Sequence, residues 1–319
     1  MDRRSFVASS LALAACTRAV AQSGPLTKIV FPFAAGGSGD LICRVLAEQL
    51  APLLGRHVIV ENRTGGDGLI AIKSVMSAAP DGTTILVTTG PTMYLLPMVE
   101  AKPSFDQARD FTPVSLLGRF EFAVVTGPAT NAADFSQLVA WLKANTAKAA
   151  YGIPSNGTIP HFAGTRIEAA LNLPMTRVPY RGGAAVVKDV IGGHLPFAVI
   201  TLSDALASHQ AGSARILAVS SATRSPYLPD VPTLKESGID LVADSWYGMW
   251  LPAGASPDFV RQLSAAVVTV LSKPDVKEKL LAVGLIPAGT TPEGLTQELA
   301  ANTAFWRPIV QATGYRISN

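Results

Sequence analysis

IVFPFAAGGSGDLICRVLAEQLAPLL, residues 29–54, carries three structural signals in succession. Its apolar start predicts a buried strand. From Leu41 to Leu53 the apolar residues recur at three- and four-residue spacing, which predicts one face of a helix, and Gly55 stands where that helix is expected to end. Between the strand and the helix lies the glycine-rich turn AAGGSGD, residues 34–40.

We predict that this turn binds a carboxylate. Glycine allows a positive φ and lets the backbone come close to a ligand. The first turn of a helix has unpaired N–H groups and a partial positive charge, so the two features together form an anion site without a cationic side chain. The turn lacks the G-x-G-x-x-G spacing of a dinucleotide turn and the G-K-[ST] ending of a phosphate loop. The alternative is that the glycines serve packing alone.

The composition indicates two well-packed domains. The chain has 319 residues, the length of roughly two domains. Hydrophobic residues make up 48% and charged residues 15%, which argues against disorder. The net charge of +3 comes without a long basic run, so no nucleic-acid partner is expected. The sequence has no HExxH, no CxxC pair and no GxSxG, so no metal, no cofactor and no catalytic residue is expected.

The N-terminus has the pattern of an export signal. Two arginines precede an apolar segment at 6–15, which is too short to span a bilayer but suits a signal peptide. Ala-Val-Ala at 19–21 fits a peptidase site, whereas LAAC ending at Cys16 resembles a lipobox and would leave a lipid anchor there. The arginine pair also resembles a weak twin-arginine signal. Each alternative sends the protein out of the cytoplasm, and we assign residues 1–22 to the signal peptide.

Once this leader is removed, Cys43 is the one cysteine left in the sequence, so no internal disulfide is expected. It lies on the first predicted helix, on or beside the apolar face. We interpret it as a small buried hydrophobic residue rather than a nucleophile.

Strands and helices alternate along the rest of the chain, which predicts an α/β fold with mainly parallel sheets flanked by helices. The predicted strands lie at 57–61, 83–89, 111–117, 121–125, 151–153, 177–180, 195–201 and 215–220, with a long aromatic strand starting near 241. The predicted helices lie at 69–79, 134–145, 160–171, from the 181–183 turn to 191, and at 256–271, 275–283 and 292–312.

Several predicted strands end in small polar groups at helix starts. In open α/β sheets ligands lie beyond the carboxyl ends of the strands, so these ends are expected to line one crevice. The middle third of the chain shows the same pattern as the first third, with strands that end in small polar groups at helix starts. Two such domains facing each other would form a cleft. Because the final helices are expected to pack back on the first domain, we predict residues 23–124 plus 245–319 as domain 1 and 125–244 as domain 2.

The chain resembles the solute receptors of tripartite tricarboxylate transporters, the TctC or Bug type. The resemblance lies in IVFPFAAGGSGD, HVIVENRTGGDGLIA, APDGTTILV, FTPVSLLG, YGIPSNGTIPHFAG, VPYRGGAAVVKDVIGGHLPFAV, SPYLPDVPTLKESG and DSWYGMWLPAGAS. Together these segments span almost the whole chain after the leader. The resemblance implies a two-domain periplasmic binding protein of the Venus flytrap kind, type II-like, with its ligand cleft between two mainly parallel sheets.

The resemblance also implies which residues hold the ligand, through backbone N–H groups, hydroxyls and bridging waters. The first-domain contacts would be Phe33, Ala34, Ala35, Gly37 and Asp40 in the opening turn, with Thr88 and Thr89. The second-domain contacts would be Ser155, Asn156, Gly157, Thr158 and His161, with Tyr180, Arg181, Gly182 and Gly183, and a selectivity position between Thr201 and Asp204, where Ser203 and Asp204 are the candidates.

Each notable side chain also has a simpler interpretation. Asp40 would repel a carboxylate, so capping the helix or ordering the turn from behind is its favoured role. His161 either donates to the ligand or a water, or acts as a catalytic base, which would need a nucleophile partner. Arg181 either binds a second carboxylate bidentately or faces solvent. The aromatic residues of 246–250 are interpreted as core or hinge rather than as a stacking platform.

Three functions therefore compete. The favoured one is a binding protein, not an enzyme, that captures a small organic carboxylate and delivers it to the membrane subunits of a tripartite tricarboxylate-type transporter. The others are a sensor subunit that presents its ligand to a signalling receptor and a small-molecule hydrolase that uses His161. For the favoured function we expect a periplasmic monomer.

Overall fold

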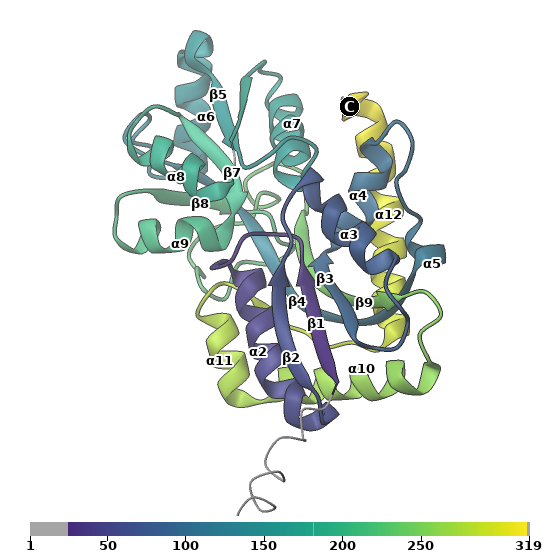
Figure 1. The fold of residues 1–319 in the computed structure, drawn as a ribbon. Coiled ribbons are helices and arrows are strands. Elements are labelled where there is room, and N and C mark those ends of the chain that lie inside the picture. The colour runs from purple at the N-terminus through teal and green to yellow at the C-terminus, as the bar shows by residue number, and fades with distance from the viewer. Residues whose placement is uncertain (1–24, 181, 318–319) are drawn as a thin grey trace, which may run out of the picture.

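The computed structural model describes residues 25–180 and 182–317 (Figure 1). The predicted leader, residues 1–22 with Cys16, lies outside the described residues, as does Arg181. The described part of the chain is an α/β fold, as its alternating pattern predicts.

Ten strands in the described part form one continuous sheet, in which the order is β2-β1-β3-β9-β4-β7-β5-β6, and β10 and β8 each pair with β4. Their bounds are β1 (Leu26–Phe31), β2 (His57–Asn62), β3 (Thr84–Thr89), β4 (Phe111–Thr126), β5 (Ala150–Ile153), β6 (Thr176–Pro179), β7 (Phe197–Thr201), β8 (Arg215–Val219), β9 (Asp244–Pro252) and β10 (Ile286–Pro287). We call β2, β1, β3, β9 and β10 the first half-sheet, and β7, β5, β6 and β8 the second half-sheet.

The sheets are mixed, which corrects the prediction that they are mainly parallel. β1 is parallel to β2 and β3, and β5 is parallel to β6 and β7. β9 runs antiparallel to β3, and β4 runs antiparallel to β9, β7 and β8. The two long strands that connect the half-sheets therefore introduce the antiparallel pairs.

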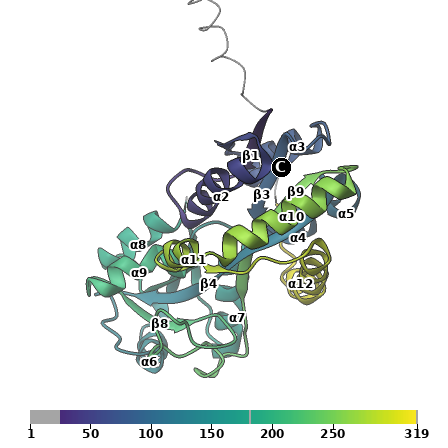
Figure 2. The same cartoon turned by 90° about the horizontal axis from the view of Figure 1, so that it is seen from below.

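β4 belongs to both half-sheets. Its pairing with β9 extends to Glu121 opposite Asp244, and its pairing with β7 begins at Phe122 opposite Thr201. Figure 2 shows this strand running from one group of helices to the other. The prediction of two separate strands, at 111–117 and 121–125, is wrong because the chain stays extended through Gly118.

Helices cover both half-sheets. They are α2 (Ser38–Leu54), α3 (Leu69–Met76), α4 (Gly90–Val99), α5 (Gln107–Asp110), α6 (Phe135–Ala144), α7 (Ile159–Leu171), α8 (Gly183–Ile191), α9 (Leu202–Gln210), α10 (Pro257–Ser272), α11 (Pro274–Leu281) and α12 (Pro292–Thr313), with short 3-10 turns at Gly66–Gly68 and Thr146–Lys148. α2 packs with α10 and α11, and α12 packs with α4 and β4 (Figure 1). Of the helices in the described part, none has the length and apolar character needed to cross a bilayer.

The first strand and helix form as their sequence predicts. The side chains of Ile42, Leu46 and Leu50, on one face of α2, are fully buried, and burial of such a side chain contributes roughly 2 kcal/mol. The helix ends at Gly55, whose φ of 61° is a left-handed conformation that glycine adopts readily. This packing fixes the start of α2 at the end of β1, where the predicted anion site lies.

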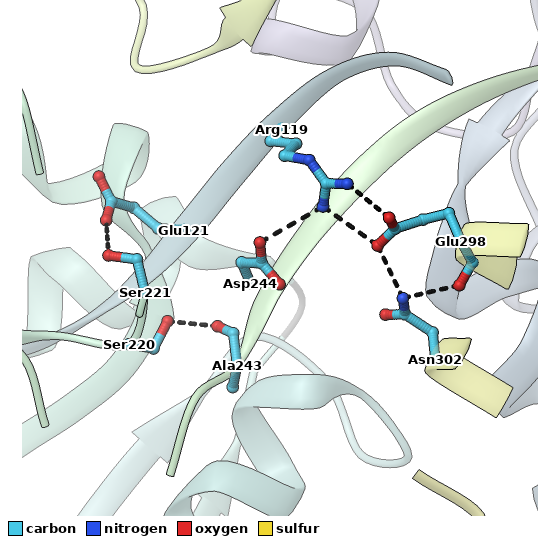
Figure 3. A network of polar contacts seen from close by, with 8 residues as sticks. All are labelled: Arg119, Glu121, Ser220, Ser221, Ala243, Asp244, Glu298 and Asn302. Carbon is cyan, nitrogen blue, oxygen red and sulfur yellow. Dashed lines mark hydrogen bonds and ion pairs between the residues drawn. The ribbon is translucent and has the colours of Figure 1, made fainter. Parts of the chain in front are cut away.

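A polar network connects β4, β9 and α12 beside the point where β4 changes partners (Figure 3). The Arg119 guanidinium on β4 lies 3.5 Å from the Asp244 carboxylate on β9 and donates to Glu298 on α12 at 3.1 and 2.5 Å. Asn302 donates to Glu298 at 2.8 Å. Because these side chains are partly exposed, each ion pair contributes roughly 1 kcal/mol or less to the free energy of unfolding.

Glu121 stands in the same region but is buried, with only 4% of its surface exposed. The Ser221 hydroxyl contacts the Glu121 carboxyl and also lies 2.8 Å from the carbonyl of Thr223. The single hydroxyl proton of Ser221 therefore has two acceptors within reach. Burial raises the pKa of Glu121, and the hydroxyls of Ser221 and Ser225 oppose this shift without cancelling it.

The raised pKa of Glu121 predicts how the stability of the fold depends on pH. Because the pKa of Glu121 in the folded state exceeds its ordinary value of 4.5, its contribution is present at low pH and is lost as the pH rises through the folded-state pKa. We expect Glu121→Gln, which keeps a donor and does not ionise, to gain thermal stability relative to the wild type between pH 5 and pH 8. Calorimetric unfolding across this range measures the difference.

Glu48→Gln, at an exposed position of α2, is the matched control and should follow the wild type. A Glu121→Gln variant that loses stability relative to the wild type as the pH rises would show that Glu121 is ionised in the fold.

Candidate functional site

The glycine turn between β1 and α2 is held from behind by Asp40. The Asp40 carboxylate accepts hydrogen bonds from the Gly36 backbone N–H at 3.1 Å, from Asn62 at 3.0 Å and from Arg44 at 2.8 and 3.2 Å. Burial raises the pKa of Asp40, but the bonds from Arg44, Asn62 and Gly36 outweigh it and hold the pKa below its usual value. The structure thus gives Asp40 the role of ordering the turn and not of facing a ligand.

The front of the same turn is open. Residues 34–37 are all exposed, and a methyl group added at Gly37 would meet nothing within 4 Å. Gly37 is the N-cap of α2 and supplies no side-chain hydrogen bond to the helix. Gly36 has a φ of 97°, a conformation that favours glycine. The first helix thus begins at an open residue without a side-chain cap, which an anion site at a helix start requires.

Aromatic side chains form the base of this turn. The Phe31 ring packs 5.2 Å from Phe33 and 6.1 Å from Tyr247, centroid to centroid. The Tyr247 hydroxyl lies 3.5 Å from that of Ser38 at the start of α2. Tyr247 is 8% exposed, so it is a core residue with its polar end at the turn. The prediction that Tyr247 is a core residue is therefore correct for its ring. The sequence pattern did not indicate where its hydroxyl lies.

The end of β3 contributes hydroxyls that face inward or serve the next helix. Thr88 is fully buried, and its hydroxyl has no partner in the described part of the chain. Thr89 is the N-cap of α4, where its hydroxyl accepts from the Thr92 N–H at 3.3 Å and lies 2.8 Å from the Thr92 hydroxyl. The structure therefore gives Thr89 a capping role.

The second turn, between β5 and α7, is held by His161 in the way that Asp40 holds the first. The Gly157 backbone N–H donates to His161 Nδ1 at 3.0 Å, across the same four-residue spacing as Gly36 and Asp40. The Thr158 hydroxyl donates to the Ser155 carbonyl at 2.8 Å. The Gly157 N–H is therefore used within the turn, and His161 is buried behind it.

His161 also does not have the surroundings of a catalytic base. It is 1% exposed, its Nε2 faces the Arg177 guanidinium, and its ring stacks on Phe162 at 4.8 Å. Burial and the Arg177 charge lower the pKa of His161 to about 4. The ring is therefore neutral at physiological pH, with Nδ1 accepting from the Gly157 N–H and Nε2 lying against the Arg177 guanidinium. The hydrolase hypothesis thus loses the residue on which it depends.

The C-terminal segment after α12 covers this second turn. The Tyr315 ring packs edge-on against His161 at 4.9 Å, and a Cβ at Gly157 would lie 3.1 Å from it. Trp306 on α12 approaches Phe162 on α7 at 6.3 Å. The last helix of the chain thus connects the first half-sheet to the N-terminal end of α7, a contact with no local signal in the sequence.

The third predicted loop lies at the start of α8. The Tyr180 hydroxyl donates to Asp189 at 2.6 Å, so its proton is already used. Gly182 is open, with nothing within 4 Å of an added Cβ, whereas a Cβ at Gly183 would lie 1.9 Å from Asp204 Oδ2. A Cβ added at Gly284, in the loop before β10, would lie 3.5 Å from the Ser203 Cβ.

Asp204 stands in the first turn of α9 and is exposed. Burial raises the pKa of Tyr247 to about 12, and the charge of Asp204 makes a smaller contribution in the same direction. Ser155 and Thr158 are half-buried and Asn156 is exposed at the start of α7. The predicted residues that present open surface are therefore the 34–37 segment, the 155–158 turn, Gly182 and Asp204.

Two hollows on the surface lie elsewhere. One, of about 220 Å³, is lined by Val242, Ala243, Asp244, Ala301, Asn302, Phe305 and Trp306, and the other by Ala222, Thr223, Arg224, Thr233, Lys235 and Glu236. None of these is a predicted site residue. Within residues 25–180 and 182–317, no group of three acidic, histidine or cysteine side chains is arranged to hold a metal ion.

Comparison with known proteins agrees with the resemblance drawn from the sequence motifs. Residues 42–315 match the TctC family, described as the tripartite tricarboxylate transporter family receptor. Protein BugT of Bordetella pertussis is 29% identical over 293 residues, which cover 91% of this chain and 90% of BugT.

Solved structures are similar over nearly the whole chain. The structure described as R. palustris Rpa4515 with adipate has a TM-score of 0.84 and 26% identity, covering 91% of this chain and 98% of that one. MatC from Rhodopseudomonas palustris with bound malate has a TM-score of 0.79 and 25% identity, covering 89% and 98%. The predicted periplasmic binding protein fold is confirmed, with the sheets mixed as described above.

The neutral imidazole of His161 predicts a loss of stability in acid. Because its pKa is about 4 in the fold against an ordinary 6.5, the free energy of unfolding falls as the pH drops from 6.5 to 4. At about 1.4 kcal/mol per unit, this loss amounts to about 3 kcal/mol. We expect His161→Asn, whose side-chain oxygen can still accept from Gly157, to remove this part of the acid sensitivity in denaturant unfolding.

His57→Asn, at an exposed position of β2, serves as the control and should leave the pH profile unchanged. An acid profile that is the same in His161→Asn and wild type would show that His161 is charged, or exposed, in the folded state.

Proposed function

The chain belongs to the tripartite tricarboxylate transporter receptor family, and we propose that it captures a small organic carboxylate between two lobes and delivers it to a membrane transporter of the tripartite tricarboxylate type. Receptors of this family are periplasmic solute-binding proteins. The observation that carries the proposal is the open, uncapped start of α2 behind exposed glycines, fixed by Asp40.

The proposed lobes are residues 23–124 with 245–319, and residues 125–244. The change of β4 partners between Glu121 and Phe122 supports this division. Because β4 and β9 are the long strands at this junction, bending of the pair would let the lobes close. Closure would bring the starts of α7 and α8 toward the start of α2, so that backbone N–H groups from both lobes surround one carboxylate.

The ligand class follows from this chemistry and from the relatives. Helix N-termini favour anions, and adipate and malate, bound to the two similar solved structures, are both dicarboxylates. We therefore propose a small organic carboxylate for this chain. Delivery to a transporter and presentation to a signalling receptor are distinguished by which membrane partner the ligand-loaded protein retains in a pull-down.

Ligand binding should stabilise the protein without consuming the ligand. We expect at least one acid in a panel of mono-, di- and tricarboxylates to raise the melting temperature of the mature protein in a concentration-dependent way, because a ligand that binds only the folded state adds RT ln(1 + [L]/Kd). Chromatography after incubation should recover the acid unchanged. Turnover of the acid, or no stabilisation by any member of the panel, would contradict the proposal.

Substitution at Gly37 tests whether the first turn is the site. Its φ of −87° and ψ of 174° suit valine, and the space around it is empty, so Gly37→Val should fold and block the ligand. Gly37→Asp should add an N-cap side chain, which contributes roughly a few tenths of a kcal/mol more than glycine, and place its own carboxylate where the ligand binds. We expect both variants to lose affinity at least tenfold by calorimetric titration, while Gly37→Asp gains thermal stability without ligand.

Gly37→Ala, which adds a single methyl group, should weaken binding less than Gly37→Val. Full affinity in Gly37→Val would remove the first turn from the site.

A further inference from the structure

A hollow of about 220 Å³ lies between α12 and the segment that leads into β9. One wall is the chain at residues 242–244, where it enters β9 from the second half-sheet. The other wall is a strip of α12 whose members are one, four and five positions apart, so that they share one face of the helix. They are Ala301, Asn302, Phe305 and Trp306.

The polar groups that line this hollow are hydrogen-bond acceptors. Asn302 Nδ2 donates to the backbone carbonyl and to the carboxylate of Glu298, both at 2.8 Å. The amide oxygen of Asn302 is therefore the group left for an occupant, and Figure 3 shows it on the side toward Asp244. Asp244 adds a carboxylate, whose side-chain partner within the described residues is Arg119 at 3.5 Å.

The charges beside the hollow do not balance. Arg119 makes its two shorter contacts, at 3.1 and 2.5 Å, with Glu298 rather than with Asp244. Glu121 stands directly opposite Asp244 in the pairing of β4 with β9 and adds a further carboxyl group. Even with Glu121 protonated, the network in Figure 3 has two carboxylates for one guanidinium. The hollow therefore borders an excess negative charge, at the carboxylate of Asp244.

A buried tyrosine on the neighbouring helix is consistent with this charge. Tyr94, on α4, is 2% exposed, and its hydroxyl has no hydrogen-bond partner in the described part of the chain. Burial raises the pKa of Tyr94, and the charges of Asp244 and Glu298 add to this effect. Because α4 packs against α12, negative charge predominates on both sides of the network.

The rest of the α12 wall is apolar and aromatic. The side chain of Phe305 is 48% exposed, whereas that of Trp306 is buried. The two rings meet edge-on, with their centroids 5.3 Å apart. An exposed aromatic ring beside a hollow offers apolar surface for a hydrocarbon group, and aromatic faces also attract cations.

We propose that this hollow binds a small organic cation, a primary ammonium group on a short alkyl or arylalkyl chain. The ammonium group would donate to the Asp244 carboxylate and to the Asn302 amide oxygen, and the hydrocarbon group would lie against Phe305 and Trp306. The inference goes beyond the proposed function, because none of these residues belongs to the proposed carboxylate site.

The test pairs each amine with the alcohol of the same carbon skeleton, which keeps the shape and removes the charge. Calorimetric titration at pH 7.5, well below the pKa of roughly 10 of an alkylammonium group, would compare n-butylamine with n-butanol, benzylamine with benzyl alcohol and 2-phenylethylamine with 2-phenylethanol. We expect the mature protein to bind at least one amine ten times or more tightly than its alcohol. Asp244→Asn should weaken binding of that amine at least tenfold, which equals about 1.4 kcal/mol, and leave binding of the alcohol unchanged.

Asp240→Asn is the matched control for the lost charge, because Asp240 is an exposed acid of the same segment and does not line the hollow. It should keep the affinities of the wild type.

A second pair of variants tests the place of binding. Ala301→Leu, at an exposed helical position, should fold and occupy the hollow with its longer side chain. We expect it to weaken binding of amine and alcohol alike, at least tenfold for the amine. Ala300→Leu, at the preceding exposed position outside the hollow, should bind as the wild type does. Thermal unfolding of both variants checks that they fold.

Several results would overturn the inference. These are no binding of any amine, equal affinity for each amine and its alcohol, or wild-type amine affinity in Asp244→Asn or in a folded Ala301→Leu. Titration of the carboxylate panel on the same samples keeps the two proposals apart. Failure of the amines leaves the proposed function standing, and failure of every carboxylate leaves the cation site standing.

Discussion

The antiparallel pairing of β4 with β9 is the constraint on which the rest of the structure depends. These two strands are the last pair of the first half-sheet, and β4 continues directly into the second. Ser220 adds to the connection, because its backbone bonds Phe122 and Ala243 at 2.9 and 2.8 Å. Every turn of the candidate site extends from one half-sheet or the other, so their separation is set by this junction.

The two glycine turns share one local hydrogen-bond arrangement. In each, a residue four positions after a glycine accepts that glycine's backbone N–H, and so fixes the turn from inside the first helical turn. Asp40 does this as an anion neutralised by Arg44, and His161 does it as a neutral imidazole beside Arg177. Because the ordering groups lie behind the turns, the front of the first turn remains open, and neither site requires a cationic side chain in front.

Much of this arrangement could be predicted from local sequence, and the exceptions have physical causes. α2 was predictable because one of its faces is apolar and Gly55 ends it. α4 was missed because it is apolar on nearly all sides and contains Pro97, so it shows neither a helical period nor an uninterrupted run. The single strand β4 was missed because Gly118 resembles a turn residue, whereas in the fold β10 approaches it so closely that an added Cβ would lie 3.1 Å from the Ile286 carbonyl oxygen.

The candidate residues were correctly placed at turns, but which of them face outward depends on hydrogen bonds such as that from Gly157 to His161, and local sequence does not encode these.

Glu121 and His161 depart from their ordinary proton affinities in opposite directions. Where both shifts apply, the first group retains a proton that it would release on unfolding, and the second lacks a proton that it would take up. The two exchanges partly offset each other in the number of protons exchanged on unfolding. The stability that Glu121 contributes therefore falls as the pH rises, whereas the stability that the neutral His161 contributes falls as the pH drops.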